Sequence, residues 1–245
     1  MNNTRDPARW SKKNSLTRLL RKSPIPDEEL GRNLGLYLDR QTLSRILFIQ
    51  HLYELIVGVH GNVIEFGTRW GQNMALFHSF RGFYEPYNMT RRLICFDTFS
   101  GFPGVDKEDG KYASAHEGAF SVSNGYEHHL DEVLAEHETR SPLSHIRRYE
   151  IIKGDAGTQF REYLENNPQT IVALAFFDMD LYRPTKECLS LLREYLTKGS
   201  VVAFDELNIK EWQGETIAYR EVLALGRYAI RRSPYSSSTS FIVID

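Results

Sequence analysis

Five short apolar runs, each with an acidic residue at or near its end, constrain the fold of this chain more than any other feature. The runs occupy residues 62–67, 93–97, 149–153, 170–178 and 200–205, and their acids are Glu65, Asp97, Asp155, Asp178 and Asp205, of which Asp155 follows its run by two residues. The third run is the weakest, but in the others the apolar residues are continuous rather than alternating. Continuous apolar runs are typical of strands buried on both faces of a parallel sheet that helices flank.

The segments around these runs complete the expected architecture. Helical spacing recurs at residues 71–80, 156–165 and 184–196, and residues 227–232 and 239–244 alternate like a terminal antiparallel pair. The pattern predicts an α/β fold, a doubly wound sheet that is mostly parallel with a C-terminal antiparallel strand.

The length of 245 residues favours one domain of this kind. We expect a flexible N-terminal segment or lid over residues 1–26 and a single domain over residues 27–245. Within that domain, residues 27–59 should form two amphipathic helices, and residues 60–245 should form a Rossmann-like core.

Charge and cysteine content indicate which partners and which cellular compartment to expect. The formal net charge of −2 gives no reason to expect nucleic acid or a membrane as a partner. No apolar run approaches the ~18 residues of a membrane span, and the first segment lacks the apolar core of a secretory signal. Cys95 and Cys188 lie in apolar stretches as buried free thiols would, so we expect a cytoplasmic protein.

The loop from Gly67 to Asn73 is the first candidate for ligand binding, because ligands of such sheets bind beyond the carboxyl ends of the strands. Its glycines, Gly67 and Gly71, let the backbone approach a ligand at the head of the next helix. The spacing G-x-G-x-x-G is absent, which argues against a pyrophosphate cofactor. Glu65 suggests a cationic ligand group, such as the amine of a methionine moiety; an ordinary tight turn explains the loop equally well.

Two further strand ends complete a nucleoside pocket without phosphate-binding residues. Asp97 is placed to accept hydrogen bonds from ribose hydroxyls, and Asp155 with Ala156 is placed to meet an adenine edge. S-adenosylmethionine requires such a pocket. The alternative is that both acids simply end their strands in solvent.

Two neighbouring strand ends each carry a pair of acids. The pairs are Asp178 with Asp180 and Asp205 with Glu206. Converging carboxylates repel one another unless a hard cation joins them, and Mg²⁺ or a similar divalent ion suits such oxygen ligands. The ion would lower the pKa of a substrate hydroxyl, and a carboxylate outside the ligand set would take the proton. In the alternative, Asp205 and Glu206 cap the following segment and Asp180 pairs with Arg183.

These motifs together resemble the macrocin-type sugar O-methyltransferases, metal-dependent enzymes that modify deoxysugars of natural products. The resemblance runs from about residue 38 to residue 225. It rests on residues 96–103 (FDTFSGFP), residues 177–182 (FDMDLY), and Trp212, Gly214 and Glu221. Residues 204–207 (FDEL) are similar to the enediyne deoxysugar methyltransferases within that group.

The resemblance implies a class I methyltransferase fold and a set of site residues. It implies that Asp178, Asp205 and Glu206 hold the metal and that Asp180 is the general base, so that Asp178 and Asp180 are the catalytic pair. The cofactor site would comprise Glu65, Gly67, Thr68, Arg69, Gly71, Asp97, Thr98, Asp155, Ala156 and Asp178. The family usually has two aspartates at 205–206 and small residues in the 68–71 loop, where this chain has Trp70. It also implies a homo-oligomer, with the N-terminal helices as the interface.

The sequence therefore predicts an enzyme that methylates a hydroxyl of a small sugar-containing acceptor, either a natural-product deoxysugar or a nucleotide-linked sugar. The alternatives are an O-methyltransferase of a catechol-like diol, a nicotinamide-dependent reductase, and a non-catalytic module on the same fold. Residues 106–123 form a long polar loop that we expect to act as a substrate lid, with His116 as a possible contact.

Overall fold

The computed structural model describes residues 15–110, 115–236 and 238–245, and the chain divides into two compact units, residues 1–47 and 48–245. In the first unit, residues 15–21 are helical, followed by α2 (Asp27–Leu30), the 3₁₀ helix η1 (Gly31–Tyr37) and the start of α3 (Arg40–Ile56). The prediction of two amphipathic helices over residues 27–59 holds for α3 only. Gly31 and Gly35 weaken the first helix, and a 3₁₀ segment replaces most of it.

The second unit is built on a seven-stranded sheet in the order β3-β2-β1-β4-β5-β7-β6. The strands are β1 (Asn62–Phe66), β2 (Leu93–Asp97), β3 (Tyr149–Lys153), β4 (Val172–Phe177), β5 (Leu196–Phe204), β6 (Arg231–Arg232) and β7 (Ser240–Val243). Strands β1 to β5 are parallel, whereas β7 pairs antiparallel with both β5 and β6. The predicted doubly wound sheet is confirmed, although β5 begins four residues before the apolar run that predicted it.

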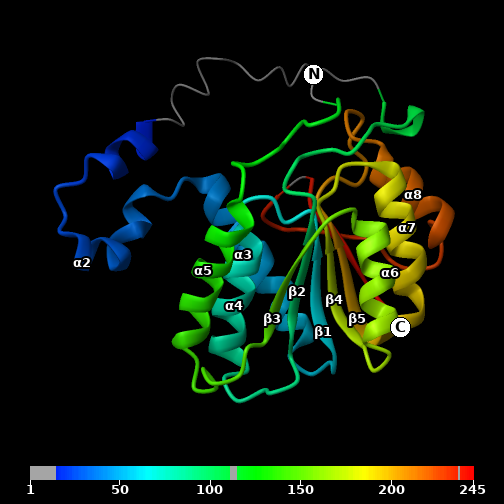
Figure 1. The fold of residues 1–245 in the computed structure, drawn as a ribbon. Helices are drawn as coiled ribbons and strands as arrows, with labels where there is room; N and C mark the ends of the chain where they lie inside the picture. Colours follow the sequence, from blue (N-terminus) through cyan, green and yellow to red (C-terminus); the bar gives the residue numbers. More distant parts are fainter. Residues whose placement is uncertain (1–14, 111–114, 237) are drawn as a thin grey trace. The chain divides into compact units, whose positions relative to one another are not determined.

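Helices cover both faces of this sheet (Figure 1). One face carries residues 48–56 of α3 with α4 (Gln72–Tyr84) and α5 (Tyr126–Thr139). The other carries α6 (Ala156–Asn166), α7 (Tyr182–Leu192) and α8 (Gly214–Val222). Two short 3₁₀ helices, η2 (Lys107–Asp109) and η3 (Arg193–Tyr195), lie in the connections.

Each face of the sheet has its own apolar core. Side chains of β1 alternate between the two, because Ile64 and Phe66 join the core under α6–α8 while Val63 joins the core under α3–α5. Cys95 and Cys188 are buried, unbridged members of these cores, as expected. No helix in the described part of the chain is both long enough and apolar enough to cross a membrane.

The strand order fixes where a ligand can approach the sheet. From β1 the chain builds outward to β2 and β3, and from β4 it builds in the opposite direction to β5, so the order reverses between β1 and β4. Two segments follow these strands at their carboxyl ends, the loop from Gly67 and the segment from Asp178. The switch point therefore lies between them, and it is the place where ligands of such sheets bind.

Candidate active site

Gly67 and Asp178 lie in contact at the switch point. The N–H of Asp178 donates to the carbonyl oxygen of Phe66 (2.9 Å), and a Cβ on Gly67 would lie only 2.1 Å from the carbonyl oxygen of Asp178. Gly67 has φ of +88°, which an L side chain rarely adopts. The close approach of backbone expected at this glycine is therefore present, and it is made to the acid-bearing segment after β4.

Glu65 lies on β1 with no exposed surface. Its two carboxylate oxygens accept hydrogen bonds from Thr68 Oγ1 (3.1 Å) and Asn73 Nδ2 (2.7 Å). These donors tie the strand to the loop and to the first turn of α4, and they compensate for the burial of the acid. Its expected contact with the amine of a methionine moiety stays a prediction.

Asp97, at the end of β2, joins two loops above the sheet. Its carboxylate accepts hydrogen bonds from the N–H of Arg69 (2.7 Å) and the N–H of Phe99 (2.6 Å). Burial raises the pKa of this carboxyl, and the two N–H donors oppose that rise. Each oxygen keeps a further lone pair, so the carboxylate can still accept a hydrogen bond from a ribose hydroxyl.

The other proposed cofactor residues have local structural partners. Asp155 is the N-cap of α6 and accepts from the N–H (3.0 Å) and Oγ1 (2.9 Å) of Thr158, while Ala156 is buried at the start of the helix. Thr98 Oγ1 donates to the carbonyl oxygen of Gly101 (2.7 Å). Gly71, at φ of +76°, precedes α4, where a Cβ would collide with Leu130. These contacts hold the loops in shape without assigning a ligand.

Trp70 and Arg69, in the loop after β1, each contact an aromatic side chain. Trp70 is 44% exposed and makes an edge-to-face contact with Tyr126, with ring centroids 4.7 Å apart. The guanidinium of Arg69 lies 5.0 Å from the ring centre of Phe120. Phe120 in turn packs against Phe102 and Trp212, which forms a small apolar cluster at the carboxyl edge of the sheet.

Strands β4 and β5 bring the two expected acid pairs to neighbouring tips, as the N–H of Asp205 donates to the carbonyl oxygen of Phe177 (3.1 Å). The pKa of Glu206 is raised to about 9, first by burial and then by the charges of Asp180, Asp205 and Asp178. Its Oε2 is buried and has no hydrogen-bond partner among the described residues. The sequence-predicted acids therefore act on one another electrostatically, as their spacing suggested.

Glu215, on the first turn of α8, is an acid that the sequence analysis did not single out. It forms an acid cluster with Asp178, Asp180, Asp205 and Glu206. It is completely buried, and its pKa is raised well above the ordinary value by burial and then by Asp180, Asp178, Asp205 and Glu206. Its Oε2 faces the N–H of Glu206 at 3.4 Å, and within the described residues its Oε1 has no partner. In the sequence it looks like an ordinary acid at a helix start.

The acid that the family motif places on this helix, Glu221, lies elsewhere. Its side chain is 44% exposed, and its carboxylate pairs with Lys186 Nζ (2.7 Å) and accepts a hydrogen bond from Tyr182 Oη (2.7 Å). Arg183, the alternative partner of Asp180, has its nitrogen Nε 3.7 Å from Asp106 Oδ2.

In their present rotamers, the side chains of the acid cluster do not form a metal-binding site. Among the residues described, no group of three or more His, Cys, Asp and Glu side chains is placed so that it could hold a metal ion. The chemistry of the donors nevertheless fits a hard divalent cation, because the cluster offers carboxylate oxygens, two of them buried and without hydrogen-bond partners in the described chain. A change of side-chain rotamers would be needed to bring those oxygens around one ion.

The predicted lid at residues 106–123 is described in part, since residues 111–114 lie outside the described residues. His116 is exposed, and its Nδ1 lies 3.0 Å from the carbonyl oxygen of Glu117.

Comparison with known proteins agrees with this fold. The model of the TylF family, macrocin O-methyltransferases, matches residues 44–225. A crystal structure of CalS11, a calicheamicin methyltransferase, is 44% identical, with 97% of this chain and 93% of that chain covered and a TM-score of 0.94. The apo structure of CalS11, described as a TDP-rhamnose 3'-O-methyltransferase of calicheamicin biosynthesis, is 40% identical over 97% and 94% of the chains, with a TM-score of 0.86.

More distant comparisons add only the fold. The O-methyltransferase NovP is 19% identical over 82% of this chain and 79% of its own, with a TM-score of 0.60. No curated protein matches the sequence. The family match covers the five parallel strands and the acid-bearing segments described above, and the CalS11 match covers 97% of the chain. The chain therefore belongs to the TylF macrocin O-methyltransferase family and is an S-adenosylmethionine-dependent O-methyltransferase.

Proposed function

We propose that the protein methylates a hydroxyl of a deoxysugar carried on a nucleoside diphosphate, as a step in natural-product biosynthesis. The observation that carries the proposal is the match to CalS11, at 44% and 40% identity over 97% of this chain, because that protein is described as acting on TDP-rhamnose. The acid cluster supplies what such a reaction requires of the protein, namely carboxylates next to the switch point.

Asp180 is the general base of this proposal. The acceptor oxygen bonds to the methyl carbon as the bond from that carbon to the sulfonium sulfur breaks, and Asp180 takes the hydroxyl proton. The residue sits between Asp178 and the start of α7, in a left-handed turn with φ of +62°. The rest of the site aligns the two reactants, which is the main requirement of an in-line displacement.

Asp178, Asp205 and Glu206 are the proposed ligands of a divalent ion, Mg²⁺ being the first choice. Bound there, such an ion lowers the pKa of the acceptor hydroxyl. Support comes from the raised pKa of Glu206, whose neighbouring acids disfavour its charge, and from its buried unpaired Oε2. Both features are relieved when a cation sits among the oxygens.

The cofactor is proposed to bind over the switch point. Gly67, Thr68, Arg69 and Gly71 provide the loop, with Glu65 beneath it. Asp97 and Thr98 face the ribose, Asp155 and Ala156 face the adenine, and Asp178 lies at the sulfonium end. The tight packing of Gly67 against Asp178 supports this placement, because it brings the cofactor loop and the acid cluster together.

We also propose a homo-oligomer that assembles through the first unit and acts in the cytoplasm. Four leucines of that unit, Leu34, Leu36, Leu38 and Leu43, are between 39% and 64% exposed. Exposed apolar side chains at this density favour a partner surface. Light scattering coupled to gel filtration tests the proposal, and a monomer at micromolar concentration would refute it.

The acceptor is tested by incubating the protein with S-adenosylmethionine, Mg²⁺ and either TDP-rhamnose or a catechol. Mass spectrometry should detect S-adenosylhomocysteine together with methylated TDP-rhamnose. Methylation of the catechol alone would transfer the proposal to the diol alternative. Binding of S-adenosylmethionine without methylation of TDP-rhamnose would contradict the proposed acceptor.

A further inference from the structure

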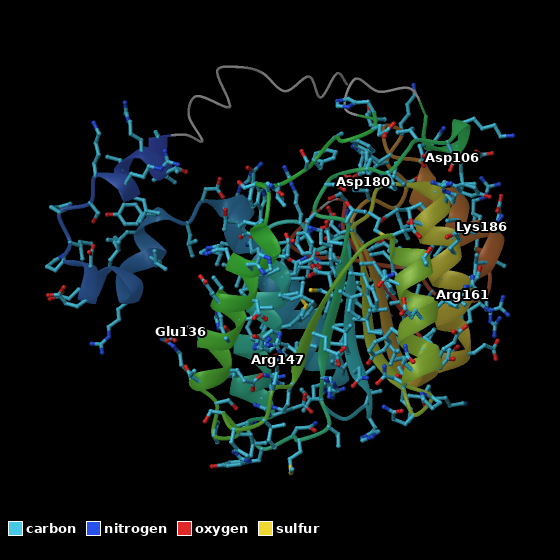
Figure 2. The ribbon with its side chains drawn as sticks, in the orientation of Figure 1. Asp106, Glu136, Arg147, Arg161, Asp180 and Lys186 are labelled. Carbon is cyan, nitrogen blue, oxygen red and sulfur yellow. The ribbon has the colours of Figure 1, made fainter. Side chains whose placement is uncertain are left out.

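We propose that Asp109 is a positioning residue that holds the segment bearing Asp180 in its reactive geometry. The inference rests on the proposed role of Asp180 as base. Asp109 ends η2 and is 1% exposed, and it belongs to none of the motifs that identify the family in this sequence. Figure 2 shows Asp106, which opens the same turn, at the same end of the sheet as Asp180.

Both oxygens of the Asp109 carboxylate are used to hold backbone. Oδ1 accepts from the N–H of Tyr182 at 2.5 Å, and Oδ2 accepts from the N–H of Asp106 at 2.7 Å. Tyr182 is the first residue of α7, and the preceding residue, Leu181, gives that helix no side-chain cap. Asp109 therefore caps α7 from another part of the chain, where a negative charge is favoured by the helix dipole.

The segment between Asp178 and Tyr182 is strained and needs support at both ends. Asp180 has φ of +62°, and the N–H of Leu181 donates to the carbonyl oxygen of Met179 (2.7 Å), which closes a tight turn around the proposed base. A non-glycine residue in this conformation is destabilised and persists where its surroundings hold it. At one end the N–H of Asp178 donates to Phe66 (2.9 Å), and at the other the N–H of Tyr182 donates to Asp109.

The start of α8 is packed against the same contact. A Cβ on Gly214 would lie 2.5 Å from Asp109 Oδ1, 2.6 Å from the nitrogen of Tyr182 and 3.0 Å from the carbonyl oxygen of Asp180. Only a residue without a side chain fits there. Asp109 thus joins the turn at residues 106–109, the start of α7 and the start of α8, and displacement of its carboxylate should displace Asp180.

The test is a double-mutant cycle with Asp109→Asn and Asp180→Asn. An asparagine must present its amide NH₂ to one of the two N–H groups, so it keeps the shape but loses a hydrogen bond. We expect Asp109→Asn to lower kcat at least tenfold while the Kd for S-adenosylhomocysteine changes less than twofold. In the Asp180→Asn background the same change should lower kcat less than twofold, because the base whose position it secures is already absent.

Glu108→Gln is the matched control, since it removes a charge from the same turn without touching Tyr182. It should keep kcat within twofold. Should Asp109→Asn fail to fold, Asp109→Glu keeps the charge but shifts the carboxylate by one methylene, and it should give the same selective loss of kcat.

Three outcomes would overturn the inference or its premise, and they differ from one another. Multiplying losses in the double variant mean that Asp109 has only a structural role. A normal kcat in Asp109→Asn, beside a slow Asp180→Asn, rejects the positioning role alone. A normal kcat in Asp180→Asn rejects the proposed base itself.

Discussion

Glu215 of α8 lies with its carboxylate oxygen Oε2 3.4 Å from the main-chain nitrogen of Glu206, so two carboxyls with raised pKa values are neighbours at the carboxyl edge of the sheet. Each folded-state pKa lies above its unfolded value of about 4.5. Each carboxyl therefore contributes its full share to the free energy of unfolding below about pH 4.5, where it is protonated in both states. That contribution is lost as the pH rises towards the folded-state pKa, which is about 9 for Glu206.

Glu215→Gln should for this reason flatten the pH dependence of the metal-free protein. In EDTA, the free energy of unfolding of the original protein should fall between pH 5 and pH 9, and the variant should lose less of it. Urea denaturation at both pH values measures the difference. Glu211→Gln, at an exposed position in the same region, is the control and should follow the original protein; equal slopes for Glu215→Gln would contradict the prediction.

Asp205→Asn tests the proposed ion. Mg²⁺ should raise the Tm of the original protein, since binding to the folded state alone stabilises it. The variant should lose most of that rise and at least a hundredfold in kcat, while its Kd for S-adenosylhomocysteine stays within a few-fold. Isothermal titration with Mg²⁺ and with S-adenosylhomocysteine separates the two sites. Full turnover of the original protein in EDTA would remove the metal from the mechanism.

Gly67→Ala tests the contact between the cofactor loop and the acid-bearing segment. The added Cβ would lie 2.1 Å from the carbonyl oxygen of Asp178, so the backbone must move. We expect the free energy of unfolding to fall by about 3 kcal/mol or more. Gly118→Ala is a matched control: its φ is +75°, but no atom of the described residues lies within 4 Å of the added Cβ. The Gly118→Ala variant should lose only roughly 1–2 kcal/mol of the free energy of unfolding, which is the strain of an L-residue in the left-handed conformation. Similar losses in both, by urea denaturation, would refute the packing argument.

His78 gives a prediction away from the site. Burial lowers its pKa to about 2, helped by the charges of Arg81, His137 and Arg148, so the folded state keeps the ring neutral. The unfolded chain binds this proton near pH 6.5, and stability is therefore lost as the pH falls below that value, by up to about 1.4 kcal/mol per unit.

His78→Gln should reduce the loss of stability between pH 6.5 and pH 4.5, whatever its effect at neutral pH. Urea denaturation across that window measures the slope. His128→Gln, at an exposed position on α5, should leave the slope as it is. Identical slopes for His78→Gln and the original protein would show that the ring is protonated in the folded state.

The sheet could be predicted from the sequence because its signal is local. All parallel strands except β3 contain the continuous apolar run that predicted them, and β2 and β3 have the predicted limits. Residues 27–37 were misjudged because leucine spacing alone does not form a helix where Gly31 and Gly35 weaken it. The early start of β5 also escaped prediction, because Thr197 and Lys198 near its start are polar and exposed and interrupt the apolar run.

The site divides in the same way. The sequence by itself determined that Asp178, Asp180, Asp205 and Glu206 gather at one edge, because parallel strands end side by side. Only the tertiary structure decided that Glu215 joins them from α8 and that Asp109 caps α7. Both contacts depend on which distant segments pack together. In the sequence, an acid at a helix start looks the same whether its carboxyl is buried or exposed. The physical reason is that strand and helix formation follow from neighbours along the chain, whereas the burial and charge of a side chain follow from neighbours in space.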